Sequence, residues 1–274
     1  MLVDIVTVVF DQEVYLLEWQ AKSINKFLKP EEINEIIIVD NGSQSCRPIL
    51  DWYGKFKSKV RILNHGNLGL KVMPHLDGWR TQQLCKILSA SQSTCDYSLI
   101  LDAKTLFAKE TCISNFFDNH KPAVGTIAVS EYWEDAKQYL EQYFNIAINN
   151  ALGPGGVPFF FHSDTLREMI NHIPDFNTWF QNNLYEQTHP HRTKVTEFML
   201  YNAFVLFRYG NYDSLYSTEK MTIQPFNVAD WQVDEFENIF NVDADTISVA
   251  EKTKTLLTNE QLSRWEAFLD DKYN

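Results

Sequence analysis

The chain has 274 residues, of which 45% are hydrophobic and 14% aromatic, so it can bury the core of one large α/β domain. The formal net charge of −12 argues against nucleic acid as a main partner, because phosphate backbones require clustered Lys and Arg. No apolar run approaches the ~20 residues that span a bilayer, and residues 1–10 lack the basic start of a signal peptide. We therefore expect a cytoplasmic protein, and its four widely spaced cysteines favour reduced thiols over disulfides or a zinc site.

The first part of the chain alternates predicted strands and helices. Short apolar runs predict strands at residues 5–10, 35–40, 60–63 and 97–101, and helical spacing of apolar residues predicts helices at 14–28 and about 77–91. A strand, a helix and a strand in succession form a right-handed unit with parallel strands. Residues 1–107 are therefore expected to form one half of an α/β fold with a mainly parallel sheet.

The second part of the chain is less regular. The patterns predict strands at 123–129 and 157–161 and a helix at 133–147. They also predict a flexible junction at 153–156, a polar loop at 188–194, and helix N-caps at Ser163 and Thr196. A capping box at 258–261 is expected to open a last helix. We find no internal repeat and no clear linker. The whole chain is therefore interpreted as one domain, divided into residues 1–107, 108–257 and a C-terminal helix at 258–274.

Acidic residues follow three of the predicted strands. Asp11 and Asp40 end the first two, and Asp102 ends the buried strand at 97–101, with Lys104 two residues later. Open α/β sheets bind ligands at the carboxyl ends of their strands, where an acidic residue can meet a divalent cation or a sugar hydroxyl. The alternative is that each carboxylate only caps a turn.

The helix predicted at 77–91 carries three polar residues on one face. Arg80, Gln83 and Lys86 recur every three residues, so one ligand can meet all three. Arg80 and Lys86 are the best candidates for binding a diphosphate, because charged donors bind phosphate oxygens strongly. A merely solvated helix face is the alternative.

No standard phosphate-binding loop is present. The first strand is not followed by GxGxxG, and GxxxxGK[ST] does not occur, so the dinucleotide and P-loop sites lack their fingerprints. Any nucleotide must be held by other means.

The order of these motifs resembles the GT-A type of nucleotide-sugar glycosyltransferase. The motifs are Thr7-Val-Val-Phe-Asp11, Ile38-Val-Asp-Asn-Gly-Ser43, Gly78-Trp-Arg-Thr-Gln-Gln-Leu-Cys-Lys86, Leu101-Asp-Ala-Lys-Thr105, Pro158-Phe-Phe-Phe-His162 and Thr196-Glu-Phe-Met-Leu-Tyr201. They are closest to a poorly characterised bacterial and phage group within that class, over about residues 4–205. The resemblance implies a GT-A fold with a nucleotide-binding half at 1–107 and an acceptor half at 108–257. It also implies transfer of a sugar from a nucleoside diphosphate to an acceptor hydroxyl.

The resemblance also assigns roles to individual residues. It implies that Thr7, Asp11, Asp40, Arg80, Gln83, Lys86, Asp102 and Lys104 contact the nucleotide sugar. Glu197 is the candidate base for the acceptor hydroxyl proton, although the helix dipole alone explains an acid in a first turn. His162 follows an apolar strand and is expected at the same sheet edge, as a residue for acceptor or metal or as a structural histidine.

The sequence departs from the class at the metal-binding motif. Asp102-Ala-Lys104 stands where two aspartates usually hold Mg²⁺ or Mn²⁺. One ligand is lost and a positive charge is added, so we expect cation binding at Asp102 to be weakened or absent. Lys104 can itself screen the leaving diphosphate, or it can be a solvated turn residue or a partner of Asp102.

Two other functions remain open at this stage. A sugar nucleotidyltransferase shares the general sheet, but it needs a Gly-rich, basic loop after the first strand, which Phe10-Asp-Gln-Glu-Val14 does not supply. A non-catalytic glycan- or nucleotide-binding module that lost its metal pair is the other alternative, and Lys104 is the feature that favours it.

Overall fold

The computed structural model describes most of the chain. The described residues are 1–42, 47–70, 78–183, 195–228, 238, 240–249 and 257–273, and the side chains of residues 12, 47, 48 and 78–80 are not described. The predicted polar loop at 188–194 therefore lies outside the described residues.

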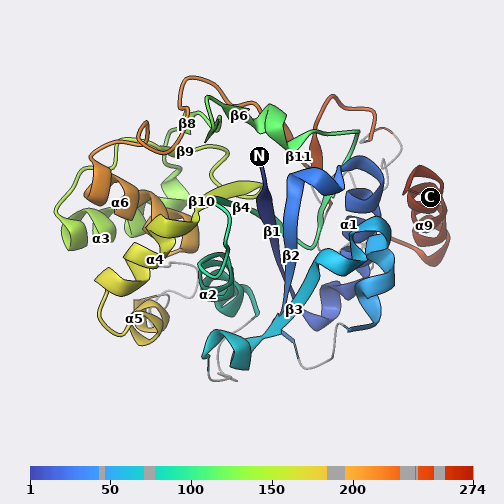
Figure 1. Cartoon of the computed structure of the whole chain (residues 1–274), viewed down its shortest axis with the longest axis horizontal. Coiled ribbons are helices and arrows are strands. Elements are labelled where there is room, and N and C mark those ends of the chain that lie inside the picture. Colours follow the sequence, from blue (N-terminus) through green and yellow to red (C-terminus); the bar gives the residue numbers. More distant parts are fainter. Residues whose placement is uncertain are drawn as a thin grey trace.

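A five-stranded sheet forms the centre of the molecule (Figure 1). In spatial order its strands are β10 (Phe159–His162), β4 (Tyr97–Asp102), β1 (Val3–Val9), β2 (Ile33–Asp40) and β3 (Val60–Asn64). The four strands from β4 to β3 are parallel to one another, and β10 runs antiparallel to β4. The predicted α/β architecture with a mainly parallel sheet is confirmed.

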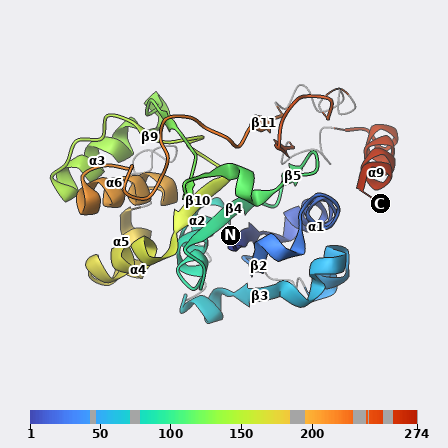
Figure 2. The same ribbon diagram turned by 45° about the horizontal axis from the view of Figure 1, so that its top comes forward.

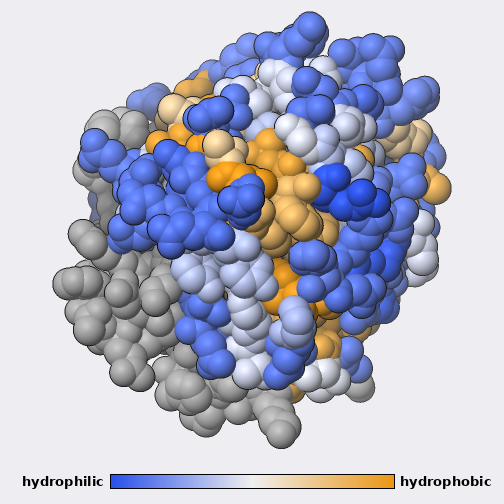
Figure 3. All heavy atoms as spheres, turned by 90° about the vertical axis from the view of Figure 1, so that its left-hand side faces the viewer, coloured by the Kyte–Doolittle hydropathy of each residue, from blue (hydrophilic) through white to orange (hydrophobic). Residues whose placement is uncertain are grey.

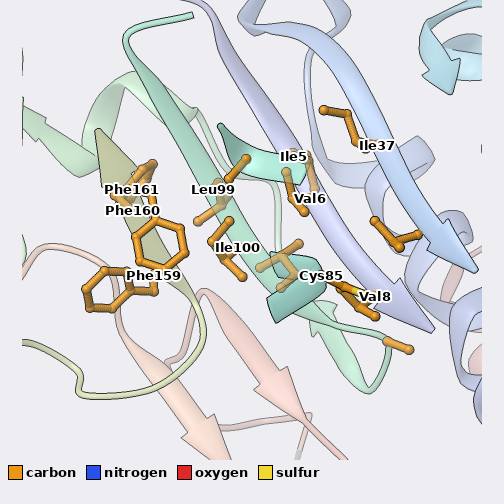
Figure 4. Packing of buried hydrophobic residues seen from close by; sticks show 14 of the residues in the cluster. Ile5, Val6, Val8, Ile37, Cys85, Leu99, Ile100, Phe159, Phe160 and Phe161 are labelled. Atoms are coloured by element: carbon orange, nitrogen blue, oxygen red, sulfur yellow. The ribbon is translucent and has the colours of Figure 1, made fainter. Parts of the chain in front are cut away.

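Both faces of the sheet are covered, which explains why its strands are almost continuously apolar. Every residue of β1 is buried, and β2 buries the run from Ile36 to Val39. Helix α1 (Val14–Phe27) lies on one side of the sheet and α2 (Gly78–Ala90) on the other (Figure 1). Figure 4 shows the resulting core, in which aliphatic side chains of β1, β2 and β4 pack beside the three phenylalanines of β10.

The other elements surround this sheet. The helices are α3 (Glu134–Phe144), α4 (Ser163–His172), α5 (Phe176–Asn183), α6 (Glu197–Tyr209) and α9 (Asn259–Tyr273). Short 3₁₀ helices lie at Asp11–Glu13, Pro30–Glu32, Arg47–Lys59, His65–Leu68, Ile113–Phe116 and Glu131–Trp133. The short strands are β5 (Thr105–Phe107), β6 (Phe117–Asp118), β7 (Lys121–Pro122), β8 (Thr126–Ile127), β9 (Ala151–Leu152), β11 (Pro225–Asn227) and β12 (Thr246–Ser248). Figures 1 and 2 both place α3 to α6 beyond β10, on the side of the molecule opposite to α9.

The chain after Asp102 joins a second sheet that the sequence patterns did not predict. Strand β5 pairs antiparallel with β12, which pairs parallel with β11. The segment that carries Asp102 and Lys104 is therefore held between two sheets, one on each side of the turn.

Two predictions about the second half are wrong. Residues 123–129 do not form one strand, because Gly125 has a φ of +62° and interrupts it; only Thr126–Ile127 forms β8. Ser163 is not an N-cap, because α4 begins with Ser163 itself after His162, and the Ser163 hydroxyl has no hydrogen-bond partner among the described residues.

Two capping predictions are confirmed. The Thr196 side chain caps α6 by accepting a hydrogen bond from the Met199 amide. Thr258 and Gln261 bond each other's backbone amides at the start of α9, as in a capping box. Trp265 and Leu269 are buried on one face of that helix.

The side of the molecule that carries α3 and α6 exposes apolar surface (Figure 3). Tyr143 of α3 and Phe207 of α6 are each 39% exposed. Within the described ranges, no helix combines the length and hydropathy that a bilayer crossing needs.

Candidate functional site

The carboxyl ends of β1 and β4 mark the place where the strand order reverses. The chain proceeds from β1 to β2 and β3 on one side and then returns to β4 on the other side of β1. Loops leave such a point in opposite directions, and the crevice between them is where open α/β sheets bind ligands. This geometry makes the β1–β4 edge the candidate site.

Three acidic residues lie at this edge, as the sequence predicted. Asp40 pairs with Val9 and Asp102 with Val8, so the two strands end within one residue of each other along β1. Asp11 follows β1 by two residues. The predicted positions of the three residues at the carboxyl edge are confirmed.

The turn after β2 fits closely against Asp11. The Asp40 side chain accepts a hydrogen bond from the Gly42 amide, and the Asn41 amide donates to the Val9 carbonyl. A Cβ on Gly42 would lie 1.9 Å from Asp11 Oδ1, so any larger residue would require the Asp11 side chain to move.

Histidine 65 extends this edge to the end of β3, and the sequence analysis missed it. Its Nε2 lies 2.6 Å from Asn41 Oδ1. Burial lowers the pKa of His65, although the charge of Asp40 opposes the shift. The sequence did carry a signal for His65, because this histidine comes just after a predicted strand, as the aspartates do.

Glutamine 20 fixes the turn that carries Asp102. Its amide nitrogen donates to the carbonyls of Asp102, at 2.6 Å, and Thr105, at 3.1 Å. Its amide oxygen accepts from the Thr7 hydroxyl at 2.9 Å. Both side chains are fully buried, so Thr7 supports the turn from behind and does not reach a ligand as the resemblance implied.

No sequence motif pointed to Gln20, but its place on α1 was a signal. It lies on the inward face of α1 between buried apolar residues, where a polar side chain needs a buried partner. Ser23, on the same face, accepts from the Phe107 amide and so holds β5 as well.

Lysine 86 lies between two carboxylates at the centre of the site. Its Nζ is 2.8 Å from Asp102 Oδ1 and 3.2 Å from Glu197 Oε1. The side chains of Lys86, Asp102 and Glu197 are 3%, 23% and 8% exposed, so the three charges share a largely water-free space. We call these residues the buried charge triad. It joins α2, β4 and α6, three elements that are far apart in sequence.

Burial and the neighbouring charges shift the pKa of each member of the triad. Burial alone lowers the pKa of Lys86, but the two carboxylates outweigh it and raise that pKa, so the ammonium form persists. Burial likewise raises the pKa of Asp102, but the charges of Lys86 and then Lys104 outweigh it and lower that pKa. Burial raises the pKa of Glu197, and Lys86 offsets only part of this shift.

The other residues predicted on the Lys86 face are placed only in part. Gln83 is 1% exposed, and neither atom of its side-chain amide has a hydrogen-bond partner among the described residues. Arg80 lies in α2, but its side chain is outside the described residues. Lys86 is too deeply buried to belong to a solvated helix face.

Histidine 162 does not lie at the predicted edge. Because β10 is antiparallel to β4, its last residue, His162, pairs with Tyr97, at the start of β4. Its Nδ1 lies 2.9 Å from the Thr165 hydroxyl, and its ring packs 5.1 Å from that of Tyr97. The expected location beside Asp102 is therefore wrong, because the sequence pattern gave the strand but not its direction.

A cavity of about 160 Å³ opens beside the start of α6. It is lined by Ile127, Ala128, Val129, Ser130, Trp133, Ala151, Pro154, Gly155, Phe198, Met199 and Asn202. Phe198 lines this cavity and also contacts the triad, with its ring 5.4 Å from Lys86 Nζ. One side chain, that of Phe198, therefore contacts both the mainly apolar cavity and the triad.

Comparison with known proteins identifies the family. The sequence matches, over residues 11–247, the model of a family described as "Family of unknown function (DUF6492)". The chain belongs to the DUF6492 family. No match was found among curated protein sequences.

Solved structures similar to this DUF6492 protein are glycosyltransferases. An active-site mutant of LgtC is 14% identical, covers 95% of each chain and has a TM-score of 0.50. The galactosyltransferase LgtC with donor and acceptor sugar analogs is 13% identical over 95% of this chain and 99% of that one, with a TM-score of 0.49. Mouse xyloside xylosyltransferase 1 is 10% identical over 90% and 97%, with a TM-score of 0.44. The likeness to the LgtC mutant, together with the sheet order, shows the GT-A fold.

The site of this DUF6492 protein does not suit a divalent cation. Mg²⁺ and Mn²⁺ prefer several oxygen ligands, yet the carboxylates of Asp102 and Glu197 both face one ammonium group. Among the described residues, no three His, Cys, Asp or Glu side chains converge as a metal site. The ammonium group of Lys86 therefore occupies the position between the two carboxylates that a bridging metal ion would need.

Proposed function

We propose that this DUF6492 protein is a glycosyltransferase that moves a sugar from a nucleoside diphosphate to an acceptor hydroxyl. The observation that carries the proposal is the β1–β4 edge of a GT-A fold, where Asp11, Asp40, Asp102 and Lys104 lie at or just after the carboxyl ends of the strands. Fold alone does not determine function, so the proposal depends on the chemistry of these residues.

The donor would lie along this edge. Asp11 and Asp40 suit the hydroxyls and N–H groups of a nucleoside, since ionised carboxylates only accept hydrogen bonds. Lys104 is partly exposed beside Asp102 and would stabilise the leaving diphosphate without a metal ion. In this proposal neither Mg²⁺ nor Mn²⁺ is required for donor binding.

The acceptor would enter through the cavity beside α6. Phe198 and Met199 line it, and Glu197 directly precedes them in the chain. The acceptor oxygen would form a bond to the anomeric carbon while the bond from that carbon to the diphosphate oxygen breaks. The hydroxyl proton would pass to Glu197, whose raised pKa brings it closer to the working range of a general base.

The first test is donor binding by thermal unfolding. Millimolar nucleoside-diphosphate sugars should raise the melting temperature, because a ligand that binds only the native state stabilises it. Asp40→Asn should reduce the shift. Asp51→Asn is the matched control, since Asp51 is 79% exposed and lies in a 3₁₀ helix between β2 and β3. If no nucleotide sugar changes the melting curve, the proposal is wrong.

The second test separates an enzyme from a binding module. Release of nucleoside diphosphate from the donor, with and without candidate acceptors, should occur in the wild type and fall strongly in Glu197→Gln. Donor binding without any release in the presence of varied acceptors would favour a non-catalytic module of the same fold.

A further inference from the structure

The buried charge triad has the geometry of a cation site with a cation already in it. Carboxylates from two different elements, β4 and α6, converge on one point, and the point is occupied by Lys86 Nζ at 2.8 and 3.2 Å. Two buried carboxylates without a counter-charge would repel each other at low dielectric. The ammonium therefore offsets the negative charge of this pair, as a bound metal ion does for paired carboxylates in other proteins.

A divalent ion cannot share this bridging position with the ammonium. Mg²⁺ binds its oxygen ligands at about 2.0–2.1 Å, so an ion that bridges Asp102 Oδ1 and Glu197 Oε1 would have to lie almost where Nζ lies. A metal ion beside the ammonium would also place three positive charges against two negative ones in a nearly water-free pocket. Moving Lys86 away is equally unfavourable, because it is 3% exposed and packed against the Phe198 ring.

We propose that the Lys86 ammonium is the built-in cation of this site: it excludes divalent ions from Asp102 and Glu197, and removing it converts the two carboxylates into a divalent cation site. The inference does not depend on glycosyl transfer, since it concerns the ion held by the triad and is measured without a sugar nucleotide.

The inference predicts a gain of metal binding. Lys86→Ala removes the charge and opens a space that water and one ion can fill, leaving two carboxylate ligands. We expect Mn²⁺ binding by this variant to be at least tenfold tighter than by the wild type. Binding is measured by the loss of the free Mn²⁺ signal in electron paramagnetic resonance and by the change in melting temperature between Mn²⁺ and EDTA.

Two further variants identify the ligands. Lys86→Ala combined with Asp102→Asn should lose the gained Mn²⁺ binding, because only one carboxylate remains. Lys86→Arg keeps a positive charge and should bind Mn²⁺ no better than the wild type.

The chain also offers a matched control at its surface. Lys22 Nζ lies 3.0 Å from Glu18 and 2.6 Å from Asp270, and these side chains are 20%, 35% and 53% exposed. Lys22→Ala likewise leaves two carboxylates, but they are flexible and hydrated, so no Mn²⁺ binding should appear.

The proposal is overturned if wild-type protein binds Mn²⁺ in a manner that Asp102→Asn abolishes. It is also overturned if Lys86→Ala binds Mn²⁺ no more tightly than Lys22→Ala. Should Lys86→Ala fail to fold, Lys86→Ser, which opens nearly the same space, takes its place with the same expected gain, and the wild-type measurement decides independently.

Discussion

Lys86 and Lys22 each contact two carboxylates, and the two lysines differ in burial. Lys86 contacts Asp102 and Glu197 in the interior, whereas Lys22 joins α1 to α9 at the surface through Glu18 and Asp270. The distances are nearly the same, from 2.6 to 3.2 Å. Water screens the surface group, so its charges are individually dispensable, while the buried charges depend on one another. Burial, and not contact distance, therefore decides how strongly the charges of an ion pair depend on one another in this protein.

The largest expected effect comes from breaking the buried charge triad. Lys86→Met should lower the free energy of unfolding by about 3–5 kcal/mol, because it leaves two carboxylates buried without a counter-charge. Lys22→Met should cost at most about 1 kcal/mol, as for other exposed pairs. Urea titration of both variants measures the difference.

A double variant sharpens this result. Glu197→Gln in the Lys86→Met background removes one of the two unpaired charges and should recover part of the lost stability. Equal losses for Lys86→Met and Lys22→Met, or no recovery in the double variant, would show that the triad is not electrostatically coupled.

The next effect compares Lys86 with Lys104, which is partly exposed at the same edge. If Lys104 meets the donor diphosphate, Lys104→Ala should weaken nucleoside-diphosphate binding by about 1.5–3 kcal/mol, roughly ten- to a hundredfold. Binding of the free nucleoside should be unchanged, since it has no phosphate. Isothermal titration with EDTA present gives both values. If the Lys104→Ala variant binds the nucleoside diphosphate as tightly as the wild type, Lys104 has no role in donor binding and is only a turn residue.

A neutral pair of glutamines extends the comparison to hydrogen bonds. Gln20→Ala should cost about 1–3 kcal/mol of stability, because it leaves buried polar groups of Asp102, Thr105 and Thr7 without their partner. Gln138 of α3 bonds Glu134 at the surface, and Gln138→Ala should change stability by less than about 0.5 kcal/mol. Chemical denaturation of the two variants checks this, and similar losses would contradict it.

The smallest effect concerns pH. Burial lowers the pKa of His162 in the folded state, although Asp164 and Asp96 oppose the shift. The unfolded chain therefore binds more protons than the native one as pH falls below about 6.5, so His162 makes the protein lose stability there. His162→Asn should reduce the loss of stability between pH 7 and pH 5, measured by urea titration at each pH. An unchanged slope would exclude His162 as a contributor.

The sequence predicted the parallel strands because their physical signal is local. Runs such as Ile36 to Val39 are apolar on both faces, and the helical spacing in residues 14–28 ends at Pro30, so both patterns are visible without the fold. The register of parallel strands then placed Asp11, Asp40 and Asp102 at one edge. Lys104 was equally visible in the sequence, because it replaces the second aspartate of a short metal-binding motif.

Strand direction and the partners of buried polar groups were decided only by the tertiary structure. His162 follows an apolar run just as Asp102 does, but a strand's periodicity is the same in both directions, and β10 proved antiparallel. Lys86 looked like a surface ligand because spacing on a helix does not say which face is covered. Its contacts with Asp102 and Glu197, like those of Gln20 with the turn after β4, join residues far apart in sequence. Sequence determined the strands and the acidic edge because these depend on neighbouring residues, whereas burial and charge pairing arise only when distant segments pack together.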